Sequence, residues 1–93
     1  MIVIVSEEEL LQKVKDGLGI VGTYQEDTLV IYINEVKEYL AGAGVEKNVI
    51  QSRKAIGIIC RGVTDLWNYG SGKLSEYFLQ RAAQLVYEEG AEE

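Results

Sequence analysis

The sequence has no histidine, no proline and a single cysteine, and each of these scarcities restricts what the protein can be. Without histidine, the chain lacks the commonest general base, the commonest zinc ligand and the base of Ser-His and Cys-His nucleophile systems. Cys60 has no partner for an intrachain disulfide, and its place in an apolar, helix-like run favours a buried structural residue in a reducing compartment. We therefore expect a protein that is not an enzyme and that uses no metal or cofactor.

Two short patterns resemble ligand sites but fit other roles better. Residues 70–73 (GSGK) resemble part of a phosphate-binding loop, yet Trp67 and Leu74 stand where that motif requires Gly and Ser or Thr. We interpret this segment as a turn between helices. Glu35 and Glu38 lie three apart on one helical face, but without further ligands such a pair is typical of a solvated surface.

Positive charge is also scarce, with nine Lys and Arg against fifteen Asp and Glu. Four of these acids lie in the last six residues, so residues 1–87 carry nine positive and eleven negative charges (fifteen minus four). Arg53, Lys54 and Arg61 form a sparse basic side, which we interpret as surface ion pairing, with Arg61 paired to Asp65. This balance argues against tight binding of nucleic acid through its phosphates.

Hydrophobic periodicity predicts four helices in one domain, separated by glycine. The first begins at Ser6, where Glu9 completes a capping box, and ends at residues 17–19. The second begins at Thr23, or at Asp27 in a shorter version, and ends at residues 42–44. Its apolar residues recur at helical intervals, although residues 28–33 also have the composition of a strand. The members of this stripe are Leu29, Ile33, Val36 and Leu40.

The third predicted helix is the longest and central one, from Asn48 to Trp67 or Tyr69. Gly57 and Gly62 lie inside it, and we expect close approach of another backbone to compensate their low helix propensity. The fourth helix begins after Ser75, with a staple between Leu74 and Leu79, and ends near Tyr87; its expected apolar face is formed by Phe78, Leu79, Ala82, Leu85 and Val86. The predicted fold is an all-α compact bundle of about four helices with short loops. Residues 1–87 form the domain and residues 88–93 a short acidic tail.

Eight aromatic rings are many for a core of this size, so some of them should remain exposed. Exposed tyrosine beside arginine is typical of protein interfaces. We therefore hypothesise a subunit contact bordered by Trp67, Tyr69, Tyr77 and Arg81. Residues 1–5 are apolar but too short to cross a membrane, and they lack the basic start of a signal peptide. We expect no membrane association.

Four segments resemble one protein family: residues 24–29 (YQEDTL), 32–40 (YINEVKEYL), 61–70 (RGVTDLWNYG) and 77–81 (YFLQR). Together they are similar to the head-tail connector proteins of tailed phages, also called head-completion or DNA-packaging adaptor proteins. The likeness covers roughly residues 6–87. Its most specific part is DLWNYG followed by YFLQR.

The resemblance implies a small helical structural subunit that forms a homo-oligomeric ring of about a dozen copies under the portal protein. Such a ring extends the DNA channel, helps to retain the genome and presents a surface to a downstream stopper or tail protein. DNA passes through without sequence-specific binding. The protein would be found in the bacterial cytoplasm during assembly and then at the head-tail junction of the virion. The family's portal-binding segment corresponds to residues 85–93 here, which adds Tyr87, Glu88 and Glu89 to the candidate interface.

Two alternatives remain open at this stage. One is a small helical DNA-binding regulator encoded by a phage or prophage, and the other is a minor nucleotide binder that uses Lys73.

Overall fold

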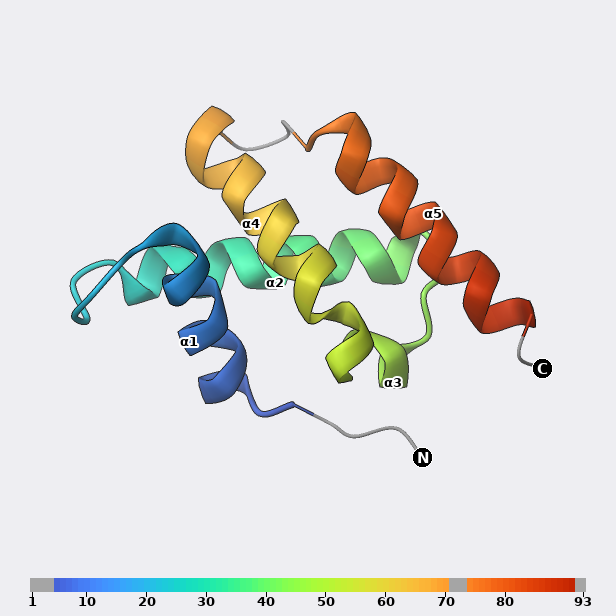
Figure 1. Ribbon diagram of the computed structural model, residues 1–93, viewed down its shortest axis with the longest axis horizontal. Coiled ribbons are helices and arrows are strands. Elements are labelled where there is room, and N and C mark those ends of the chain that lie inside the picture. Colours follow the sequence, from blue (N-terminus) through green and yellow to red (C-terminus); the bar gives the residue numbers. More distant parts are fainter. Residues whose placement is uncertain (1–4, 71–73, 92–93) are drawn as a thin grey trace.

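The computed structural model describes residues 5–70 and 74–91, with side chains up to residue 86 (Figure 1). Within these residues the chain is helical and contains no strand, so the predicted fold class is confirmed. The longer helices are α1 (Glu7–Leu18), α2 (Glu26–Gly42), α4 (Ile56–Tyr69) and α5 (Glu76–Ala91). The short helix α3 (Lys47–Ile50) and the 3-10 turn η1 (Arg53–Ala55) lie between α2 and α4.

The core lies where α4 crosses α2, and α1 and α5 flank this crossing on either side (Figure 1). The whole apolar stripe of α2 is buried here, which confirms the helix and excludes the competing strand. A strand would have placed its side chains alternately on two faces, whereas these residues share one face. The molecule is flat, with principal extents of 42 × 28 × 17 Å.

The start and end of α1 agree with the sequence prediction. The Glu9 backbone N–H donates to the Ser6 hydroxyl at 3.1 Å, and the chain leaves the helix through Gly19 at a φ of 73°. The Glu9 carboxylate lies 3.0 Å from Arg53, which ties α1 to η1. A side-chain cap and a left-handed glycine therefore fix both ends of this helix.

The predicted start of α2 was wrong. The helix begins at Glu26 rather than after Thr23 or Asp27, and its N-terminal flanking residue, Gln25, makes no side-chain capping bond. Instead the Glu26 carboxylate accepts a hydrogen bond from the Lys15 ammonium at 2.7 Å. Because Lys15 is buried, this pairing with α1 takes precedence over a capping box within α2.

The prediction of one long third helix was also wrong, because the helical segment is interrupted at residues 51–52. Ser52 is buried, and its hydroxyl donates to the Val49 carbonyl at 2.7 Å and accepts from the Lys54 N–H at 3.3 Å. These local bonds compete with continuous helical pairing and divide the segment into α3, η1 and α4.

The glycines of α4 have no close backbone neighbour of the kind expected. A Cβ on Gly62 would lie 2.8 Å from the Phe78 ring and 2.9 Å from a Val36 methyl, so side chains from α5 and α2 occupy that space. Gly57 faces open space, with nothing within 4 Å. Only Gly62 is therefore required by packing, and it allows three helices to meet.

Helix α5 begins as predicted, because the Phe78 N–H donates to the Ser75 hydroxyl at 3.1 Å. It continues to Ala91, so residues 88–91 of the predicted acidic tail belong to the helix. Leu79 was expected on the apolar face but is 39% exposed, whereas Leu74 packs against the core. Among the side chains of α5 that the structure describes, Phe78, Ala82 and Leu85 are buried.

Candidate subunit interface

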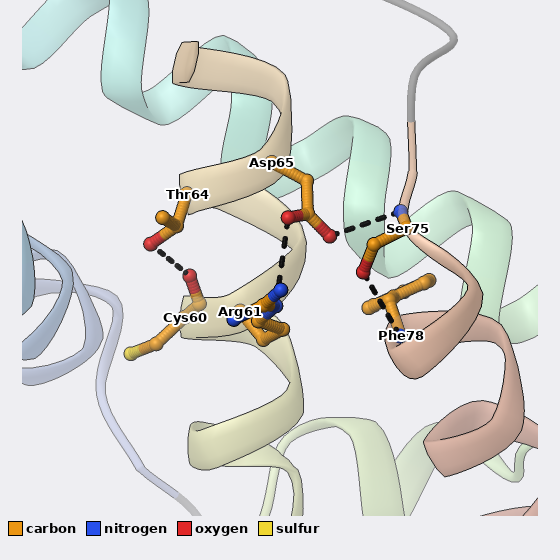
Figure 2. Close-up of polar contacts among 6 residues, drawn as sticks. All are labelled: Cys60, Arg61, Thr64, Asp65, Ser75 and Phe78. Atoms are coloured by element: carbon orange, nitrogen blue, oxygen red, sulfur yellow. Dashed lines mark hydrogen bonds and ion pairs between the residues drawn. The ribbon is translucent and has the colours of Figure 1, made fainter. Parts of the chain in front are cut away.

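The joint between α4 and α5 is built around a buried carboxylate (Figure 2). Asp65 is only 1% exposed, yet both of its oxygens have partners. Oδ2 accepts a hydrogen bond from the Ser75 backbone N–H at 3.0 Å, and Oδ1 lies 3.5 Å from Nε of Arg61. A buried charge is tolerated only when it is paired and hydrogen-bonded in this way. Asp65 therefore fixes the position at which α5 begins.

Phe78 provides the apolar half of the same joint. Its side chain is fully buried beside Gly62, and the centre of its ring lies 5.6 Å from the centre of the Tyr39 ring on α2. The capping bond from its N–H to Ser75 aligns the first turn of α5 so that this ring enters the core (Figure 2). The joint thus combines a polar anchor, Asp65, with an aromatic anchor, Phe78, which follows the Ser75 N–H bound by Asp65 by three residues.

An arginine and a tyrosine lie together on the outside of this joint. The Arg61 guanidinium is 5.2 Å from the centre of the Tyr77 ring, a distance at which the two attract each other. Tyr77 is nevertheless 56% exposed. Arg81, one turn further along α5, is also exposed and donates to Gln84 at 2.8 Å. We call Arg61, Tyr77 and Arg81 the arginine-tyrosine face.

The structure brings together some of the predicted interface residues and separates others. Tyr77 and Arg81 share one side of α5, whereas Trp67 and Tyr69 are two residues apart and point about 200° apart around α4. Trp67 packs edge-to-face on Tyr32 of α2, with ring centres 6.3 Å apart, while Tyr69 is 68% exposed. Trp67 therefore packs toward α2, and a contact bordered by both Trp67 and Tyr77 stays a prediction.

The remaining three candidates lie near the C-terminal end of α5. Tyr87, Glu88 and Glu89 are helical, but their side chains are outside the part of the chain that the structure describes. Their role in an interface stays a prediction.

Sequence reasoning missed a second set of exposed apolar residues at the N-terminal end of α2. Val21 and Tyr24, in the loop before the helix, are 91% and 92% exposed, and Ile31 on the helix is 62% exposed. The available signal was that Ile31 does not belong to the buried stripe of α2. An apolar residue on the polar side of an amphipathic helix indicates either a chance exposure or a contact with a partner.

Two hollows lie on the surface of the described residues. A hollow of about 70 Å³ lies between α1 and α2, and a shallower groove of about 310 Å³ is lined by residues of α2, α3 and the turn after it. No group of three His, Cys, Asp or Glu side chains in this part of the chain is arranged to hold a metal ion. Burial raises the pKa of the Cys60 thiol, an effect that Lys13 partly offsets, so the unreactive thiol form is favoured.

No helix in the described ranges is long and apolar enough to span a bilayer. Comparison of the chain with known protein families, curated proteins and solved structures finds no match.

Proposed function

We propose that the chain is a structural subunit of a phage or prophage head-tail connector, which forms a ring under the portal protein and extends the DNA channel. The observation that carries this proposal is the packing of the two most specific family-like segments, residues 61–70 and 77–81, against each other. Asp65 from the first and Phe78 from the second build the α4–α5 joint, and Arg61 and Tyr77 meet on its surface. The likeness therefore involves residues that determine one structural unit.

Surface composition supports an assembly role. Exposed tyrosine and arginine in close contact are the residue types that contribute most to binding at protein interfaces. The partners in this proposal are other copies of the chain, the portal protein and a downstream stopper or tail protein. An acidic chain also suits a conduit, because a negative wall repels the phosphates of DNA that must slide past it.

The decisive experiment measures particle mass by light scattering coupled to size exclusion, for the purified chain alone and with the portal protein encoded beside it. We expect a ring of about a dozen subunits to form, at least in the presence of the portal. Negative-stain images of the same fraction should show a closed ring coaxial with the portal. A chain that stays monomeric and does not bind the portal would contradict the proposal.

Duplex DNA provides the control for the alternative regulator. Binding at moderate salt with a steep loss of affinity as salt rises would favour a DNA-binding protein over a connector.

A further inference from the structure

The first relevant feature is the outward side of α2. Leu29, Ile33 and Val36 face the core, and the helical period places Ile31 on the opposite side, with Asp27 one turn before it and Glu38 two turns after it. Asp27, Ile31 and Glu38 are all exposed. We call these three residues the acidic face. The only Lys or Arg in residues 24–46 is Lys37, which is half-buried beside α1.

The arginine-tyrosine face is formed by α4 and α5 rather than by α2. On α5, the Val86 side chain lies beside Gly44, which follows the C-terminal end of α2. A Cβ placed on Gly44 would lie 3.7 Å from Cγ1 of Val86. Tyr77 is nine residues from Val86 and so lies about 180° around the helix, and Arg81 lies about 140° around it. Tyr77 and Arg81 therefore lie on a different side of α5 from Val86. The two faces lie on different helices, the acidic face on α2 and the arginine-tyrosine face on α4 and α5.

The two faces also have opposite charge and a similar apolar centre. Arg81 is bonded to the neutral amide of Gln84 and so retains its full charge, while Arg61 is partly neutralised by Asp65. The acidic face presents carboxylates one turn before and two turns after Ile31, and the other face presents the Arg61 guanidinium over the Tyr77 ring and that of Arg81 one turn further along α5. A large exposed side chain between charges of one sign is well matched by its counterpart between charges of the other sign.

We infer that a second copy of this chain docks its acidic face on the arginine-tyrosine face of the first, in a head-to-tail contact. A contact between two different faces repeats from copy to copy, and it closes into a ring when the rotation permits. A contact between two identical faces would stop at a dimer. The inference rests on the proposed function only for the ring; the contact between the faces stands on the geometry and charge of this chain.

Cysteine cross-linking tests the contact without altering the residues proposed to form it. In a Cys60→Ser background, Asn34→Cys marks the acidic face and Gln84→Cys marks the arginine-tyrosine face; both positions are exposed. The two variants, with tags of different mass, are mixed at high concentration with copper phenanthroline as the oxidant. We expect the mixed disulfide dimer to exceed either homodimer by about tenfold. Excess homodimer, or no disulfide in any mixture, would overturn the inference.

A matched control uses Gln12→Cys, which is exposed on α1, a helix that belongs to neither face. Its mixture with Gln84→Cys should give only the low yield of random collision. A yield equal to that of the Asn34→Cys mixture would show that the cross-link is non-specific and would count against the inference.

Charge reversal tests the electrostatic part. Arg81→Glu in the chain with Gln84→Cys should lower the mixed cross-link about tenfold, and Glu38→Arg in the other chain should restore most of it. Lys13→Glu makes the same change of charge on α1, which belongs to neither face, and should have no effect. Loss without restoration, or an equal loss with Lys13→Glu, would contradict the pairing of these faces.

The outcomes separate the two proposals. Rings that form on the portal without the mixed disulfide would overturn this inference and leave the proposed function standing. A mixed disulfide from a chain that never binds a portal would support this inference and contradict the proposed function.

Discussion

The connections α1–α2 and α4–α5 are both short and contain glycine, yet their neighbouring helices are held in different ways. At α4–α5 the backbone after the connection is hydrogen-bonded to buried Asp65, and Phe78 follows within one turn. At α1–α2 no side chain caps the second helix, and Lys15–Glu26 is the ion pair that links the two helices. Val21 in that loop is almost fully exposed. The α4–α5 connection orients a helix, whereas the α1–α2 connection leaves apolar side chains exposed.

The largest difference should appear when the aromatic anchor is removed. Phe78→Ala leaves a cavity beside Gly62 and should lower the free energy of unfolding by about 3–5 kcal/mol, measured by urea denaturation followed by circular dichroism. Tyr77→Ala, one residue earlier, removes a similar ring from an exposed position and should cost about 1 kcal/mol or less. Equal effects of the two substitutions would show that α5 is not anchored through Phe78.

The sequence was sufficient for the features that depend on local pattern. The buried stripe of α2, the Ser6 and Ser75 caps and the left-handed Gly19 all follow from spacing and residue type. These features depend on residues within a turn or two of each other, so a single sequence contains the information that specifies them.

The errors arose where residues distant in sequence decide the local structure. Glu26 was assigned to a capping box, but it pairs with Lys15 from the preceding helix. Likewise, Ser52 interrupts the expected long helix once it is buried, because its hydroxyl must then bond to nearby backbone groups. Neither the Lys15–Glu26 ion pair nor the interruption at Ser52 can be predicted from hydrophobic periodicity.

The candidate interface was predictable in type but not in arrangement. Exposed tyrosine with arginine was expected, and Tyr77 and Arg81 do share a side of α5. Trp67 was grouped with them because it is close in sequence, although the helical rotation turns it toward Tyr32. Contact between Arg61 and Tyr77 joins two helices and therefore had no local signal.

Removing the polar anchor, Asp65, should lower the free energy of unfolding by less than removing Phe78. Two substitutions of Asp65 separate the contribution of its hydrogen bond from that of its charge. Asp65→Ala leaves the Ser75 N–H without its acceptor and should lower the free energy of unfolding by about 2 kcal/mol. Asp65→Asn retains an acceptor oxygen and loses only the charge that pairs with half-exposed Arg61, so about half of that loss is expected. Equal losses in thermal or urea unfolding would show that the charge matters more than the hydrogen bond.

The smallest effect is expected in the α1–α2 connection, and it bears most directly on the comparison. Val21→Ser and Tyr24→Ser replace side chains that are more than 90% exposed, so each should change the free energy of unfolding by about 0.5 kcal/mol or less. Urea denaturation of both variants beside the wild type measures this. A loss above about 1 kcal/mol would mean that these side chains stabilise the isolated chain. A change in the free energy of unfolding near zero would show that these side chains do not stabilise the isolated fold, which leaves them available for contacts between molecules.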